Sequence, residues 1–346
     1  MAGVSETTQF HIEIGTRDAS PDGAETAARF AADAGFHGLQ LTETQHDPFI
    51  GCAVAAREAR RLGSPLRVST AIAVAFARNP MTVATAANDV HLAAEGRFAL
   101  GLGSQVQAHI EKRFSMPWSA PVPRMREFIG AVRAIWRAWG TGERLDVRGE
   151  HYRHTLMSPV FDPGPNPYGT PPVWLAGVGP AMTRLAGEAA DGFVAHAFTT
   201  REYLTEVSVP ALRAGRARSE LTTPVGLVAL PFVVVGPDAA TRAAQEAAVR
   251  RQIAFYGSTP AYRAVMELHG WEDVADRLHE ASRVGEWERM AALVDDDMLD
   301  AFAVVGTAAE VRDGLARRFS GVADTVCINA PDGVSAADLS ALAPGR

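Results

Sequence analysis

Two polar residues that follow a short apolar run have the chemistry to hold or move a proton. Glu43 and His46 lie in the stretch TETQHD, directly after the run 38–41. A carboxylate can accept hydrogen bonds, and an imidazole titrates near neutral pH, which suits proton transfer. The alternative for His46 is a loop side chain that pairs with Asp47.

A second stretch has the composition of an anion-binding turn. Gly177, Val178, Gly179 and Pro180 stand between an apolar run and a helical pattern. Glycines let a ligand approach the backbone, and the start of a helix offers free N–H groups and the positive end of its dipole. A tight turn from strand to helix explains the same residues, so the pattern alone leaves both interpretations open.

The stretch GRFALGLGSQ, residues 96–105, raises the same question at another strand end. A buried strand runs there into Gly101, Gly103, Ser104 and Gln105. Either these residues form a plain turn, or a large ligand lies against the backbone. Small and polar strand ends suit a flat organic cofactor that brings its own chemistry.

Other common kinds of catalytic site have no clear signature. No close carboxylate pair stands out, and no serine lies in a G-x-S-x-G turn. His151 and His154 are interpreted as structural, because they lie in an insertion and not at a strand end. We expect no metal site.

The elements that must position these residues alternate regularly. Apolar runs interpreted as strands cover 10–14, 38–41, 68–74, 98–102, 173–175, 193–197, 226–235 and 325–328, with helical patterns between them. Such alternation predicts a parallel sheet, and eight units predict an α/β fold, a (β/α)8 TIM barrel with insertions. A doubly wound sheet is the competing layout, but it rarely needs eight units. Residues 1–346 are expected to form one domain, with insertions at about 141–171 and 252–300.

Composition restricts the partners. The net charge of −7, with no Lys- or Arg-rich run, argues against nucleic acid. Two cysteines make neither a disulfide framework nor a zinc site. The start, MAGVSETTQF, lacks the features of a signal peptide, and no apolar run is long enough to cross a membrane. We therefore expect a cytoplasmic protein that acts on a small molecule.

Several motifs together resemble a known family. TETQHDPF, TAIAVAFARNP, GRFALGLGSQVQAHIEKRF, VWLAGVGPAMTRLAGEAADGFVAHAF and IAFYGSTPAYRAVMELHGW are similar to the luciferase-like monooxygenase superfamily, and more narrowly to its branch that depends on coenzyme F420. The similarity runs from about residue 7 to 330. It implies a bacterial-luciferase-like barrel that binds a tricyclic ring across its top, and it allows a homodimer.

The resemblance also implies site residues. A non-proline cis peptide is expected at Thr70-Ala71, behind the ring. The cofactor phosphate is expected on the turn 177–180, with Ala181 and Met182 starting the helix. The further expected cofactor contacts are Thr44, Gly103, Ser104, Gln105, His109, Ala176, His196 and Thr199. Thr199 is also expected to cap a helix in a box with Glu202.

The sequence departs from the family pattern after the second strand. Related enzymes often have an acid followed directly by a catalytic histidine, whereas Thr44 follows Glu43 here and the histidine is His46. Glu43 and His46 are the expected catalytic residues; otherwise proton transfer is done by other groups. The aromatic residues after the seventh strand are interpreted either as a roof over the substrate or as core packing: Phe255, Tyr256, Tyr262, His269 and Trp271.

Three functions remain open from the sequence. The first is hydride transfer between coenzyme F420 and an unidentified organic substrate. The second is a monooxygenase that uses reduced flavin mononucleotide (FMN) and oxygen. The third is a barrel that binds a flavin or deazaflavin without catalysis.

Overall fold

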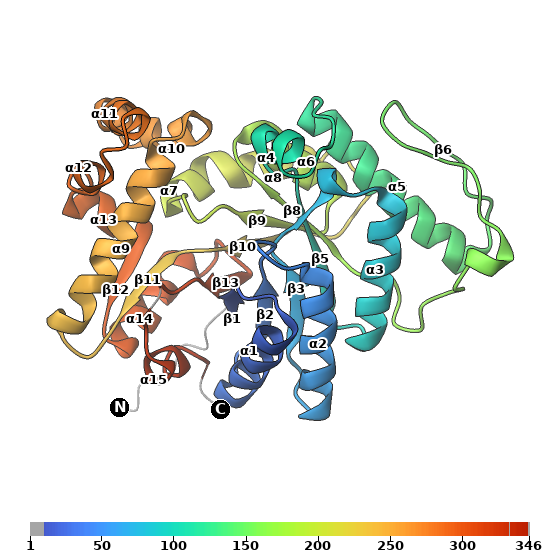
Figure 1. Cartoon of the computed structure of the whole chain (residues 1–346), viewed down its shortest axis with the longest axis horizontal. Helices are drawn as coiled ribbons and strands as arrows, with labels where there is room; N and C mark the ends of the chain where they lie inside the picture. Colours follow the sequence, from blue (N-terminus) through green and yellow to red (C-terminus); the bar gives the residue numbers. More distant parts are fainter. Residues whose placement is uncertain (1–9, 332, 345–346) are drawn as a thin grey trace.

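A closed barrel of eight parallel strands lies at the centre of the structure, a computed structural model that describes residues 10–331 and 333–344 (Figure 1). The barrel strands are β1 (His11–Thr16), β2 (Gly38–Leu41), β3 (Arg67–Thr70), β5 (Phe98–Gly103), β8 (Val173–Gly177), β9 (Gly192–Ala195), β10 (Gly226–Ala229) and β13 (Thr325–Ile328). Pairing of β1 with β13 and of β3 with β5 closes the circle. The predicted TIM barrel is confirmed.

Helices follow the strands and cover the barrel. They are α1 (Pro21–Ala34), α2 (Pro48–Arg61), α3 (Pro80–Ala93), α4 (Gln107–Lys112), α5 (Pro121–Thr141), α6 (Pro180–Ala189), α7 (Arg201–Tyr203), α8 (Val209–Arg216), α14 (Ala308–Phe319) and α15 (Ala336–Ser340). Local sequence sets several helix starts, since Ser20, Asp47 and Asn79 each accept a hydrogen bond at a first turn that contains proline.

One predicted helix cap is wrong by one residue. Thr200, and not Thr199, caps α7, and its hydroxyl accepts from the N–H of Tyr203. Both threonines can serve as caps chemically, so only the backbone conformation distinguishes them.

Two predicted strands are each divided in two. The run 68–74 forms β3 and then β4 (Ala73–Val74), and the non-proline cis peptide is Ala71-Ile72 rather than Thr70-Ala71. The run 226–235 forms β10 and then β11 (Phe232–Val235), which leaves the barrel and pairs with β12 (Ala303–Gly306). Pro231 lies between the two halves and has no N–H for a continuous ladder.

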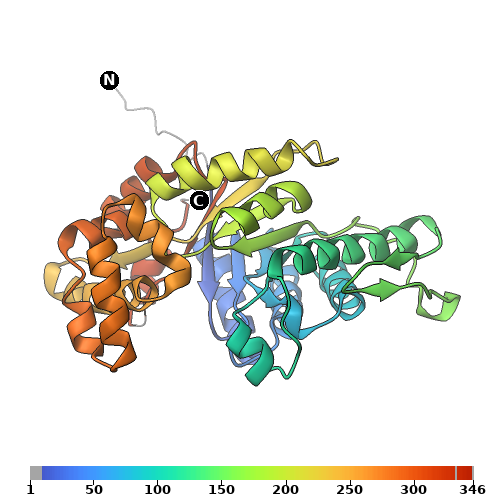
Figure 2. The same ribbon diagram turned by 90° about the horizontal axis from the view of Figure 1, so that it is seen from above.

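The segments predicted as insertions lie at opposite ends of the molecule (Figures 1 and 2). One holds the hairpin β6 (Val147–Arg148) and β7 (Arg153–His154). The other, predicted at about 252–300, holds α10 (Arg263–Leu268), α11 (Glu272–Arg283), α12 (Trp287–Ala291) and α13 (Asp296–Phe302), and it begins inside α9 (Ala239–Gly257). These five helices pack with β11 and β12 around a second buried cluster, which also takes in Phe198 and Tyr203 from the loop after β9 and from α7.

The N-terminal end of the barrel is filled by a polar network. The Glu13 carboxylate, 1% exposed, accepts from Nε of Arg67 at 2.8 Å and from Nε2 of Gln40 at 2.7 Å. Arg67 also lies over the Trp174 ring, 4.6 Å from its centroid. Because this end is plugged, ligand access is at the carboxyl ends of the strands, where TIM-barrel sites lie.

No helix among the described residues is long and apolar enough to cross a bilayer. Residues 1–9, which carry the signal-peptide expectation, lie outside the described part of the chain.

Candidate functional site at the barrel mouth

Small and polar residues surround the open end of the barrel. Ala99, Trp174, Val194, Val228 and Cys327 pack together inside it, which defines the inward face of their strands. Side chains alternate along a strand, so the inward positions nearer the mouth are Gly101 and Gly103 on β5, Ala176 on β8, His196 after β9 and Asn329 after β13. The strands therefore end in small and polar side chains at the mouth.

The two glycines of β5 lack a side chain for different structural reasons. A side chain at Gly101 would collide with the Thr70 carbonyl, so Gly101 permits close strand contact. The Thr70 hydroxyl donates to the Gly101 carbonyl at 2.7 Å and accepts its N–H at 2.9 Å. A Cβ at Gly103 would lie 2.8 Å from the Ile72 side chain. Thr70 thus joins β3 to β5 through hydrogen bonds, whereas Gly103 lies at the mouth beside the cis peptide. A cofactor contact stays a prediction for both residues.

Glu43 is held by a cation that lies 35 residues away. Its Oε2 accepts from Nη1 of Arg78 at 2.7 Å and from the N–H of Val74 at 2.8 Å, and its side chain is 6% exposed. Arg78 also pairs with Asp47, the cap of α2. This network joins the end of β2 to β4 and α2, so a catalytic role for Glu43 has to coexist with the Arg78 pair.

His46 lies on the surface next to this network. Its imidazole is exposed and lies near the Asp18 carboxylate. Thr44 donates its hydroxyl to the Arg17 carbonyl at 3.0 Å. His46 is therefore free to turn toward a ligand, whereas the Thr44 hydroxyl is already used in joining the loops after β1 and β2.

The best-formed anion cradle is the start of α6. Gly179 has φ +77° and caps the helix without a side chain, since no side-chain cap hydrogen bond is made there. A Cβ on Gly179 would meet nothing within 4 Å. Ala181, at the second helical position, is exposed. Free N–H groups, the helix dipole and open space together fit a phosphate, which is the group expected on residues 177–182.

The residues after β5 line the neighbouring part of the mouth. Ser104 donates to the Gln105 carbonyl at 3.1 Å, and Gln105 adopts φ +61° and accepts from the N–H of Val106. Both are half-buried, while His109 is exposed on α4. Their approach to a cofactor stays a prediction.

His196 is the most strongly perturbed histidine in the described chain. Its Nδ1 accepts from the N–H of Phe198 at 3.0 Å, its Nε2 lies 3.2 Å from Oη of Tyr262, and its ring stacks on Tyr262. Burial lowers the pKa of His196 to about 4 and raises that of Tyr262 to about 12. Thr199 lies nearby and lines a small cavity with Leu230.

The lowered pKa predicts acid sensitivity of stability. The unfolded chain gains a proton at His196 below about pH 6.5 and the folded chain only near pH 4, so stability is full above 6.5 and falls as the pH drops toward 4. The loss amounts to up to about 3 kcal/mol. Urea unfolding at pH 7.5 and 5 measures it, and His196→Gln should show a shallower decline; equal slopes would contradict the assignment.

A cavity of about 840 Å³ lies away from this mouth. It is bounded by α7, α13, β12 and α14, and its walls mix arginines with carboxylates. Of the predicted roof residues it takes in His269 and Trp271, whose rings stack on each other. Arg318 in its wall donates to the carbonyls of Ala301 and Ala303, so this side chain holds the second core to α14. The strand ends converge on the mouth, and the cradle at α6 lies there, so we place the candidate site at the mouth.

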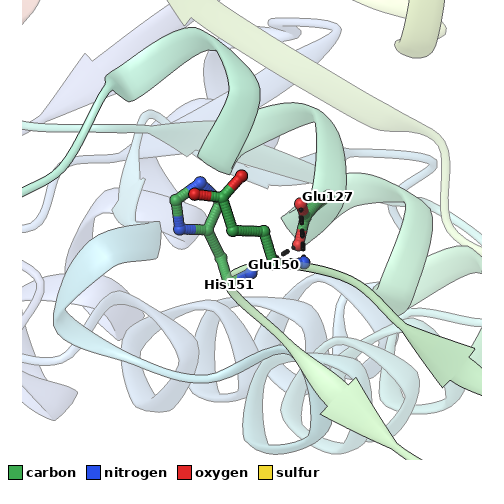
Figure 3. Close-up of side chains that lie close together, drawn as sticks. All are labelled: Glu127, Glu150 and His151. Atoms are coloured by element: carbon green, nitrogen blue, oxygen red, sulfur yellow. Dashed lines mark hydrogen bonds between the residues drawn. The ribbon is translucent and has the colours of Figure 1, made fainter.

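The hairpin contains a cluster that resembles a metal site in composition only. Glu127, Glu150 and His151 lie within ligand distance of one another (Figure 3). The Glu127 carboxylate, however, accepts the backbone N–H groups of Glu150, His151 and Tyr152 at 3.1, 2.8 and 3.3 Å. Glu127 thus holds the backbone of the hairpin turn, while the structural interpretation of the His151 side chain stays a prediction.

The sequence did not indicate two partners at the mouth. Arg78 is the cation of Glu43, and nothing in the spacing of the two residues points to the pair. Asn329 lies across Gly15, where a side chain at 15 would collide with it. Its position directly after the predicted strand 325–328 was the available signal.

The fold and mouth define a TIM-barrel protein in which the helix after the fifth predicted strand, α6, begins at an open glycine. Residues 2–325 match the luciferase-like monooxygenase family, and the chain belongs to it. The uncharacterized protein Rv1360 of Mycobacterium tuberculosis is 50% identical over 86% of this chain and 89% of that protein.

Two further matches carry the name of a cofactor. The F420-dependent glucose-6-phosphate dehydrogenase of Beutenbergia cavernae is 33% identical over 51% of this chain and 49% of that enzyme. The coenzyme F420-dependent tetrahydromethanopterin reductase of Methanopyrus kandleri superposes with a TM-score of 0.77 at 18% identity and covers 96% of each chain, which is a likeness of fold. The relatives of this chain thus include F420-dependent oxidoreductases, and the comparisons leave its own cofactor open.

Proposed function

We propose that the protein is an oxidoreductase that transfers hydride between coenzyme F420 and a small organic substrate. The observation that carries this is the open helix start at Gly179 and Ala181 at the barrel mouth, beside the small residues Gly103 and Ala176 at the ends of β5 and β8. The deazaflavin, when bound, supplies hydride chemistry at its ring carbon.

The residues of the chain would then bind and orient. The start of α6 would hold the phosphate, and Gly103 and Ala176 would let the ring lie close to β5 and β8. The Glu43–Arg78 pair would fix the loop that carries His46, and His46 would exchange a proton with the substrate. Location in the cytoplasm and assembly as a homodimer stay predictions.

A fluorescence titration of the purified protein with F420, and in parallel with FMN, tests the proposal. Tight binding of the deazaflavin alone supports it. Preference for FMN would replace it with the oxygen-using monooxygenase that the family description names. Tight binding without turnover of any substrate would favour the non-catalytic barrel.

His46→Ala should slow turnover about 100-fold, because general acid–base catalysis contributes on this scale. The affinity for F420 should change less than about twofold, since the exposed imidazole is not part of the phosphate cradle. Steady-state kinetics and the titration together separate these effects. His11→Ala is the matched control, because His11 is exposed at the opposite end of the barrel. Unchanged turnover in His46→Ala would make His46 a bystander.

A further inference from the structure

His196 connects the barrel mouth to the helical segment after β11. It comes two residues after Val194, which packs inside the barrel, so it lies on the inward side of β9 at the mouth. Tyr262, in the 3₁₀ turn Pro260–Tyr262, stacks on its ring with centroids 4.6 Å apart. Tyr256 meets the same ring edge-on at 4.7 Å. An insertion residue thus reaches the mouth.

The backbone fixes the tautomer of His196. The N–H of Phe198 donates to Nδ1, so Nδ1 carries a lone pair and no proton. A neutral imidazole has one N–H, which must therefore be on Nε2. Burial lowers the pKa of His196 to about 4, which keeps the ring neutral near pH 7.

This tautomer determines the direction of the next hydrogen bond. Nε2–H donates to Oη of Tyr262, so the Tyr262 oxygen is the acceptor. The hydroxyl proton of Tyr262 then needs an acceptor of its own. Among the described residues, the bond to His196 is the one hydrogen bond that Oη of Tyr262 makes. Tyr262 is half-buried, so part of its side chain is accessible to a molecule beside it.

We propose that Tyr262 is a substrate-binding residue, whose hydroxyl donates a hydrogen bond to an oxygen of the substrate, with His196 as the positioning residue that turns the hydroxyl outward. This inference rests on the proposed function for the identity of the reaction. The substrate class that it selects carries an acceptor oxygen, a carbonyl or a hydroxyl, at or next to the reacting carbon.

Tyr262 holds its proton in this arrangement and does not relay it. Relay of a proton through Tyr262 would require His196 to give up its Nε2–H and become an anion, which a neutral imidazole does not do near pH 7. Burial also raises the pKa of Tyr262 to about 12. The hydroxyl therefore polarises the substrate oxygen through a hydrogen bond, and the reaction's proton exchange belongs to another group.

The tautomer is tested without any substrate. Nitrogen-15 NMR of histidine-labelled protein should show an unprotonated Nδ1 and a protonated Nε2 for His196, assigned by its loss in His196→Gln. In Tyr262→Phe the same tautomer should persist, since the N–H of Phe198 fixes it. A protonated Nδ1 would overturn the inference.

The binding role is tested by Tyr262→Phe in the F420-loaded protein, with acetone, cyclohexanone and 2-propanol as probes. The variant keeps the ring, so F420 affinity should stay within about twofold. The value of kcat/KM should fall about tenfold to 100-fold, the scale of a lost donor to a polarised oxygen. Tyr168→Phe, on an exposed turn, is the matched control and should behave as the wild type.

The outcomes separate the two proposals. If the wild type binds F420 and turns over a probe, equal kcat/KM in Tyr262→Phe overturns the role of Tyr262 and leaves the proposed function intact. If the wild type binds F420 and turns over none of the probes, the oxygen-bearing substrate class is overturned. Failure of the wild type to bind F420 overturns the proposed function. The NMR result on the tautomer of His196 does not depend on that outcome.

Discussion

Gly179→Leu should weaken binding of F420 by about 100-fold or more. The leucine side chain would project from the start of α6 into the space where a Cβ meets nothing within 4 Å, which is the space assigned to the phosphate. A phosphate displaced from the helix N-terminus loses several charge-assisted hydrogen bonds together with the dipole. The fluorescence titration measures the effect directly.

Backbone strain must be separated from this effect. Gly179 has φ +77° and ψ 161°, a region of backbone conformation that is essentially restricted to glycine, so any L-residue there costs about 1–3 kcal/mol. Gly169 has φ +79° and is likewise open around its Cα, but it lies in the loop before β8. Gly169→Leu should cause a similar loss of stability with unchanged F420 affinity. Equal F420 affinity in the two variants would contradict the assignment of the phosphate site to the start of α6.

The order of strands and helices was predictable because each strand is short, apolar and bounded by turn residues. The runs 38–41 and 325–328 match β2 and β13 residue by residue. Hydrophobic periodicity carries this information locally. Hydrophobic periodicity does not indicate where a strand leaves the sheet. The run 226–235 was therefore predicted as one strand, although Pro231 separates β10 from β11.

The candidate site was predictable in its location and less so in its contacts. Gly179 directly before a helix indicated a turn, because it adopts φ +77°, which few other residue types do. The sequence around Glu43 does not indicate its ion-pair partner. Arg78 comes from another strand-to-helix loop and meets Glu43 only in the folded barrel. His196 was selected as a strand end, but its tautomer depends on the path of the backbone at Phe198.

Arg67→Met should destabilise the fold by about 3–5 kcal/mol, because it leaves the buried Glu13 carboxylate without its cation. Gln40 still donates to Glu13, but an amide hydrogen bond does not balance a buried charge. The free energy of unfolding in urea is the measurement. Arg148→Met is the matched control: Arg148 pairs with Asp146 on the surface, both half exposed, and the loss should stay below about 1 kcal/mol.

A double-mutant cycle distinguishes the lost ion pair from lost packing of Arg67 on Trp174. Glu13→Gln removes the charge, so Arg67→Met in that background should cost much less than in the wild type. If the cost is the same in both backgrounds, the stem of Arg67 on the indole accounts for the effect, and the carboxylate does not need the cation. A positive coupling energy would explain the charged pair at the closed end of a barrel whose interior is apolar at β8, β9 and β10. The pair joins β1 to β3 at that end, and the open mouth is left to the ligand.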